Sequence, residues 1–132
     1  MSTQATATFK IESWDEQPYV ETDEGGKLTR ASVKQTYAGD LEGRGEVEWL
    51  MCYRPDQTAE FVGFLRLSGT VGGRNGSVVL QSIGQFDGGV AGGPLTIVRG
   101  SGTGELAGIA GQGEFSAPHG GEPSVSLEYD FE

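Results

Sequence analysis

Short segments of alternating apolar and polar side chains recur along the whole chain. In the last of them, Val125, Leu127 and Tyr129 fall on one face and polar residues fill the positions between, which is the two-residue period of a half-buried β-strand. No long stretch keeps the spacing of an amphipathic helix without interruption by glycine or β-branched residues. The pattern predicts about eight strands, at residues 5–14, 28–38, 46–53, 60–70, 77–86, 95–99, 113–117 and 124–131.

Glycine, proline, aspartate and asparagine separate these segments. Asn75-Gly76 fits a two-residue type I′ hairpin, because both residues tolerate the positive φ that its central positions require. Pro55-Asp56 suits a turn, since proline presets φ and aspartate can bond the neighbouring backbone. Further turns are expected at Pro18 with residues 23–26, at 39–43 and at 87–89. Hairpins are therefore predicted to join most neighbouring strands.

The number of strands indicates whether the sheet is open, with two edge strands, or closed into a barrel. An open antiparallel sheet of about eight long strands leaves two exposed edges, and closure into a barrel is the arrangement that abolishes them. Gly63 and Gly84 lie inside predicted strands and suit the bends of a closed sheet, although a β-sandwich would use them too. We expect an all-β fold, an eight-stranded antiparallel closed barrel with hairpin connections. It would form one domain over residues 1–132.

The alternation also predicts which side chains face the interior. A hairpin over residues 54–58 that pairs Tyr53 with Ala59 continues the face of Trp49 and Met51 onto the next strand. A turn at Asn75-Gly76, with Arg74 opposite Ser77, continues the same face onto the strand after it. The interior face is then almost wholly apolar or aromatic: Val47, Trp49, Met51, Tyr53, Phe61, Leu65, Leu67, Val78, Leu80, Ser82 and Phe86.

An eight-stranded barrel has an interior that side chains fill or that holds one small ligand. A few polar tips inside an apolar lumen fit a small apolar or aromatic metabolite fixed by a few hydrogen bonds. The competing interpretation is a filled core in which these polar tips are satisfied locally. The candidate lumen residues are Gln35, Tyr37, Trp49, Met51, Tyr53, Phe61, Leu65, Leu80, Ser82 and Tyr129.

Four apolar residues on two adjacent strands are predicted to face outward, namely Val62, Phe64, Val79 and Ile83. A contiguous apolar patch on a protein surface usually marks an interface. We therefore expect a homo-oligomer. The alternative function follows from the same residues: a structural or interaction protein with a filled core that acts through this strip.

The charge narrows the class of partner. Nine Lys and Arg against nineteen Asp and Glu give a formal charge of −10, which repels phosphate backbones and anionic lipids. We therefore expect neither nucleic acid nor a membrane as partner. The first residues show no basic and apolar pattern of a secretory signal, and the lone Cys52 suits a reducing compartment. Both favour the cytoplasm.

No catalytic residue, metal site or cofactor is predicted. The segment 102–107 fits a relaxed dinucleotide pattern, but the glycine-rich residues after it cannot supply the phosphate-binding helix. His119 is the one histidine and is expected to be solvated in a loop. The acidic residues Glu21, Asp23 and Glu24 lack the spacing of a calcium loop.

Several strings together resemble an uncharacterised bacterial family, a domain of unknown function grouped with the allene oxide cyclase-like barrels. They are residues 13–16 (SWDE), 28–33 (LTRASV), 61–63 (FVG) and the glycine-rich 100–108 (GSGTGELAG). The resemblance covers the chain from about Ala5 to Phe131 and implies an eight-stranded antiparallel barrel. Relatives in the wider barrel group include cofactor-free cyclases and isomerases. The resemblance itself implies no reaction and assigns no residue a role. A cofactor-independent cyclisation or isomerisation, promoted by orienting a reactive molecule in the confined lumen, is the catalytic extension of the binding hypothesis.

Overall fold

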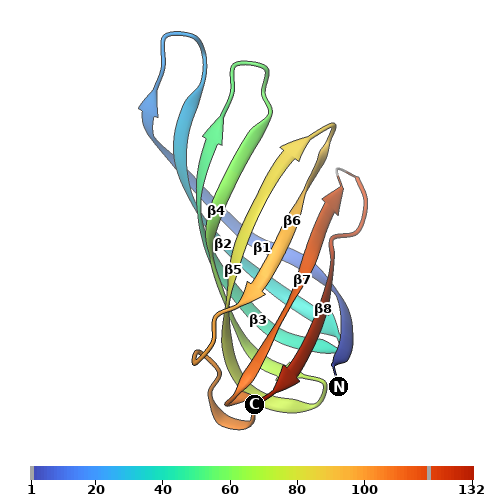
Figure 1. The fold of residues 1–132 in the computed structure, drawn as a ribbon. Helices are drawn as coiled ribbons and strands as arrows, with labels where there is room; N and C mark the ends of the chain where they lie inside the picture. The colour runs from blue at the N-terminus through green and yellow to red at the C-terminus, as the bar shows by residue number, and fades with distance from the viewer. Residues whose placement is uncertain (1, 119) are drawn as a thin grey trace.

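The computed structural model describes residues 2–118 and 120–132, and His119, the predicted loop histidine, lies outside them. Each strand pairs antiparallel with the next, and β8 pairs with β1, so that the sheet closes into a barrel (Figure 1). The predicted fold class is confirmed and the sandwich is excluded. The strands are β1 (Thr3–Glu21), β2 (Lys27–Gly39), β3 (Leu41–Tyr53), β4 (Ala59–Val71), β5 (Arg74–Asp87), β6 (Val90–Ile97), β7 (Ile109–Pro118) and β8 (Ser124–Phe131).

Several strands are longer than the sequence predicts. Pro18 lies within β1 opposite Thr29, not in a loop. Proline is tolerated there because β1 pairs with β8 only over residues 3–8, so its second half is an edge with one neighbouring strand. β3 begins at Leu41, which is buried and was expected in a turn. β6 and β7 also begin earlier, at Val90 and Ile109.

The hairpin between β4 and β5 turns at Gly72 and Gly73, and the prediction of a turn at Asn75-Gly76 is wrong. Val71 lies opposite Arg74, and the two glycines between them have φ values of +57° and +83°. Glycine adopts positive φ at no steric cost, which favours this pair over Asn75-Gly76. The observed register differs from the predicted one by an even number of residues. The side chains of β5 therefore keep their predicted faces.

A β-bulge in β1 changes which of its side chains face inward. Phe9 lies opposite Tyr37 on the interior face, and the pairing shifts between Ile11 and Ser13. Such a shift moves the following side chains to the other face. Trp14 and Glu16 thus face the barrel interior, in register with residues 33 and 31 of β2.

The two ends of the barrel differ. The hairpins β1–β2, β3–β4, β5–β6 and β7–β8 lie at one end, here called the open end, and both termini lie at the other (Figure 1). The segment between β6 and β7 also runs at the terminal end and contains a short 3₁₀ helix, η1 (Gly104–Leu106). Leu106 is fully buried and belongs to the core cluster. We call this end the closed end.

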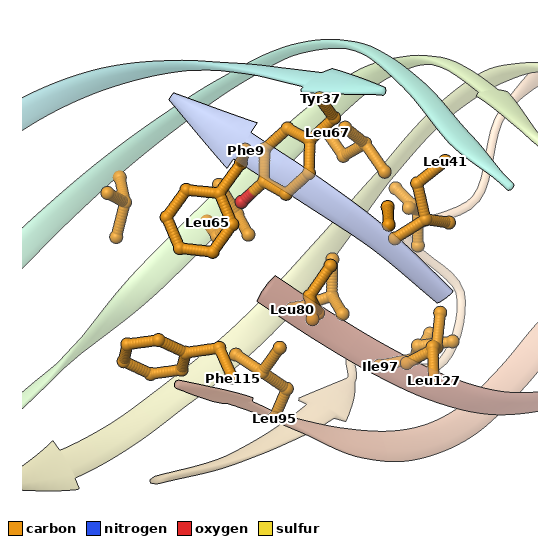
Figure 2. Close-up of a cluster of buried hydrophobic side chains, with 14 of the residues drawn as sticks. Phe9, Tyr37, Leu41, Leu65, Leu67, Leu80, Leu95, Ile97, Phe115 and Leu127 are labelled. Carbon is orange, nitrogen blue, oxygen red and sulfur yellow. The ribbon is translucent and has the colours of Figure 1, made fainter. Parts of the chain in front are cut away.

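Apolar side chains fill most of the barrel interior. Figure 2 shows Leu41, Leu80, Ile97 and Leu127, which come from different strands, gathered inside the sheet. Arg66 is exposed, as its place between the inward-facing Leu65 and Leu67 requires. In the part of the chain that is described, no helix is long and apolar enough to cross a membrane.

Candidate functional site

A cavity of about 210 Å³ lies inside the barrel at its open end. Its lining is almost wholly apolar, and an apolar protein cavity of about 150 Å³ accepts a benzene molecule. The cavity therefore has room for a molecule built on one or two small rings. The lining residues are Phe9, Ile11, Trp14, Gln35, Trp49, Met51, Tyr53, Phe61, Phe86, Ala91, Phe115 and Ala117.

Trp49 is the centre of the aromatic wall of this cavity. Its ring centroid lies 5.2 Å from that of Phe61 and 6.1 Å from that of Phe115. The indole nitrogen of Trp49 donates a hydrogen bond to the Ser82 hydroxyl at 3.2 Å. Such ring spacings are within the favourable range for aromatic pairs, and the hydrogen bond fixes the indole in place. The wall is therefore formed before any ligand arrives.

The floor of the cavity is polar at one residue, Gln35. This side chain is 3% exposed, and its amide oxygen accepts a hydrogen bond of 2.6 Å from the Tyr37 hydroxyl. Burial raises the pKa of Tyr37, so the hydroxyl is neutral. Below the cavity is a space of about 10 Å³ that Gln35 also lines. This volume is about that of one water molecule.

A carboxylate lies at the mouth of the cavity. Glu16 accepts hydrogen bonds from Thr29 at 2.6 Å and from the Trp14 indole at 2.9 Å. Partial burial raises the pKa of this carboxyl, but the hydrogen bonds that Thr29, Tyr53 and Trp14 give it outweigh burial. The pKa of Glu16 therefore lies below its ordinary value, and the group is an anion at neutral pH.

Tyr53 stands beside this carboxylate. Burial, together with the hydrogen bond to Glu16, raises the pKa of Tyr53. The Lys27 ammonium lies 5.1 Å from the centroid of the Tyr53 ring and its charge also lowers the pKa of Glu16. The mouth thus combines one anion, one cation and two aromatic rings, while the cavity behind it is apolar.

The predicted lumen residues fall into three groups. Gln35, Trp49, Met51, Tyr53 and Phe61 line the cavity. Tyr37, Leu65 and Ser82 line the small space below it. Leu80 and Tyr129 line neither, and both belong to the packed core. Tyr129 packs against Phe131, with ring centroids 5.9 Å apart, near the end of β8.

None of the other seven residues that line the cavity was predicted as a ligand contact. Trp14 was missed because the β-bulge reverses its face, and alternation alone carries no sign of an extra residue. Phe86 was predicted to face inward, but nothing in the sequence distinguishes the open end from the packed core. Phe115 and Ala117 lie on a strand whose inward face was not assigned.

The outer strip of apolar residues is only partly as predicted. Val62, Phe64 and Ile83 are exposed on the outer face. Val79 is half-buried, and its carbonyl accepts a backbone hydrogen bond of 2.9 Å from Val98 of the following segment. On the other side, Leu50 is exposed and lies directly opposite Val62. We define the outer strip as Leu50, Val62, Phe64 and Ile83.

Comparison with known proteins gives two findings. The family model described as "Protein of unknown function (DUF3224)" matches residues 5–129. The chain is also similar to a crystal structure of a protein of unknown function from the DUF3224 family of Shewanella oneidensis MR-1, at 28% sequence identity and a TM-score of 0.80. That similarity covers 100% of this chain and 99% of the other. No curated protein matches the sequence.

Proposed function

The chain belongs to the DUF3224 family of proteins of unknown function, and for this member we propose that the barrel binds one small apolar or aromatic molecule in the cavity at its open end. Membership confirms the predicted resemblance to an uncharacterised family. The grouping with allene oxide cyclase-like barrels stays a prediction. The observation that carries the proposal is the cavity of about 210 Å³ walled by aromatic rings.

The composition of the wall supports an apolar ligand. Phe61 and Phe115 pack against Trp49, and their faces provide the area on which a ring can stack. Gln35 supplies the one amide inside the cavity lining. An apolar pocket with very few polar groups is the usual form of a site for a small organic molecule.

Binding is better supported than acid–base catalysis at this site. The two tyrosine hydroxyls near the cavity have a raised pKa, which makes them weak proton donors at neutral pH. Glu16 has a lowered pKa, which makes it a weak base. A cofactor-independent cyclisation or isomerisation in this cavity would therefore rely on confinement and orientation of the substrate.

The test is a titration of the full chain with ethylbenzene by isothermal titration calorimetry. We expect saturable binding of one molecule per chain. Ala117→Phe places a ring in the cavity and should abolish binding, whereas Ser116→Phe on the exposed face of the same strand should not. Circular dichroism checks that both variants keep the β-fold. Equal binding by the wild type and Ala117→Phe would contradict the proposal.

A second function follows from the outer strip, and we propose that two copies of the chain associate through it. Leu50, Val62 and Ile83 lie side by side on β3, β4 and β5. A shallow groove of about 320 Å³ continues from them toward Tyr19 and Leu28. Exposed apolar residues in one contiguous area are typical of an interface. The homo-oligomer and the alternative interaction role would thus both use this surface.

We also propose a cellular location for the protein. Cys52 is free and exposed, and exposed free thiols persist in reducing compartments. This supports a cytoplasmic location.

A further inference from the structure

The Gln35 side chain at the floor of the cavity has a hydrogen-bonding group without a partner in the protein. Its amide oxygen accepts the hydrogen bond from Tyr37. Its amide nitrogen donates no hydrogen bond to any of residues 2–118 and 120–132. An amide nitrogen carries two donors, and leaving them unpaired in a protein interior has a free-energy cost.

The orientation of this amide is set by Tyr37. The Tyr37 hydroxyl is buried and neutral, so it needs an acceptor for its proton. Within the described chain the Gln35 oxygen is the acceptor that it has, at 2.6 Å. A flipped amide would present donors to the hydroxyl and leave its proton unpaired. The nitrogen is therefore the atom that is left for the cavity.

The nitrogen is also accessible. Every fully enclosed side-chain nitrogen or oxygen among the described residues has a hydrogen-bond partner. Because the Gln35 nitrogen has none, it is not enclosed by protein atoms. Gln35 lines both the cavity and the small space below it, and these are the volumes onto which the nitrogen opens.

Ser82 adds a second donor at the same place. Its oxygen accepts the hydrogen bond from Trp49, and its own proton is donated to none of the described residues. Ser82 is 1% exposed and lines the small space together with Gln35. The floor thus presents two donor groups, the Gln35 amide nitrogen on β2 and the Ser82 hydroxyl on β5, and neither donates to any of the described residues.

We propose that the ligand carries a neutral carbonyl oxygen, which enters first and accepts a hydrogen bond from the Gln35 amide nitrogen. This rests on the proposed function, since it names the ligand class for the same cavity. A carbonyl oxygen has two lone pairs and so matches the two donors of the floor. An alcohol would bring a further proton that needs an acceptor of its own, whereas a carbonyl oxygen brings none.

The charge of the site selects a neutral group. The lining residues of the cavity include no lysine or arginine, and a buried carboxylate without a partner is costly. The anion Glu16 stands at the mouth, and Lys27, the cation near it, lies over the Tyr53 ring. The formal charge of the whole chain is −10. A small aromatic ketone is accordingly favoured over an aromatic acid of the same size.

The experiment compares acetophenone, ethylbenzene and benzoate as probes of the full chain by isothermal titration calorimetry. One net hydrogen bond is worth roughly a factor of ten in affinity, so acetophenone should bind about tenfold more tightly than ethylbenzene. Benzoate should bind most weakly. The carbonyl stretch of bound acetophenone should shift to lower wavenumber in the infrared spectrum, a measurement that needs no variant.

Two variants test whether the Gln35 amide is the group that causes the preference for acetophenone. Tyr37→Phe keeps the Gln35 amide but removes the hydroxyl that orients it, and should reduce the preference for acetophenone without abolishing it. Gln35→Leu combined with Tyr37→Phe removes the amide without leaving the hydroxyl unpaired, and should lose the preference while still binding ethylbenzene. Equal affinity of the wild type for both probes, or tighter binding of benzoate, would overturn the carbonyl inference and leave the proposed function standing. Failure of every probe to bind would overturn both.

Discussion

Trp14 and Trp49 bring their ring centroids within 5.9 Å of each other, although β2 lies between the strands that carry them. The contact exists because the β-bulge after Ile11 turns Trp14 toward the interior. Trp14 is 44% exposed and Trp49 is 7% exposed. The pair therefore extends from solvent to the inner wall of the cavity, and each indole reports on a different depth.

This difference predicts the fluorescence of single-tryptophan variants. In Trp14→Phe the remaining Trp49 should emit at shorter wavelength and resist iodide quenching, because it is buried. In Trp49→Phe the remaining Trp14 should emit at longer wavelength and be quenched. Ethylbenzene should change the emission of Trp49 more than that of Trp14. An identical response of both variants to iodide would contradict the placement of Trp14 at the rim.

The Glu16 carboxylate predicts a pH-dependent contribution to stability. Its pKa is lower in the folded chain than the ordinary value of 4.5, so it stabilises the fold above that pH and loses this effect as the pH falls through the lowered value. Glu16→Gln should lower the melting temperature by about 1–3 °C near neutral pH, since the group is partly exposed.

The difference between wild type and Glu16→Gln should shrink below about pH 4, as measured by melting curves at a series of pH values. Thr29→Val removes one hydrogen-bond donor to the carboxylate and should reduce the stability at neutral pH as well. A difference in melting temperature that grows toward acid pH would contradict the assignment.

The closed end depends on Leu106. This side chain is fully buried beside the core residues of the neighbouring strands. Leu106→Ala should lower the free energy of unfolding by about 2–5 kcal/mol, measured by urea denaturation. Val90→Ala, at an exposed apolar position, should change it by no more than about 0.5 kcal/mol. Similar values for the two variants would show that Leu106 does not pack as described.

The outer strip predicts the mass in solution. Phe64 is 56% exposed and lies two residues along β4 from Val62, and Phe64→Glu introduces a charge into the proposed interface. The variant should elute at the monomer mass of 13.9 kDa in light-scattering chromatography, while the wild type runs as an oligomer. Gln112→Glu, exposed on β7, is the charge-matched control and should keep the wild-type mass. A monomeric wild type would contradict self-association.

Much of the fold follows from the sequence because β-structure repeats every two residues. The predicted pairing of Tyr53 with Ala59 is the observed one, and it determines the faces of β3 and β4. Even the misplaced turn between β4 and β5 left Val78 and Leu80 on the interior face, because the error was an even number of residues.

The site was harder to predict for two physical reasons. The bulge that brings Trp14 and Glu16 inside is a single extra residue, and the local sequence around Glu12 does not mark it. The second reason is that both Tyr129 and Trp49 are inward-facing aromatics, yet one lies in packed core and the other on a cavity wall. Which of them meets empty space depends on how eight strands fill the barrel together.

Leu106 has one more consequence, for the order in which molecules would enter and leave the proposed binding cavity. Because the closed end is packed around Leu106, a molecule bound as proposed would enter and leave through the open end and keep the same orientation throughout. The cavity of about 210 Å³ would then hold one such molecule at a time, so that one would have to leave before the next could bind.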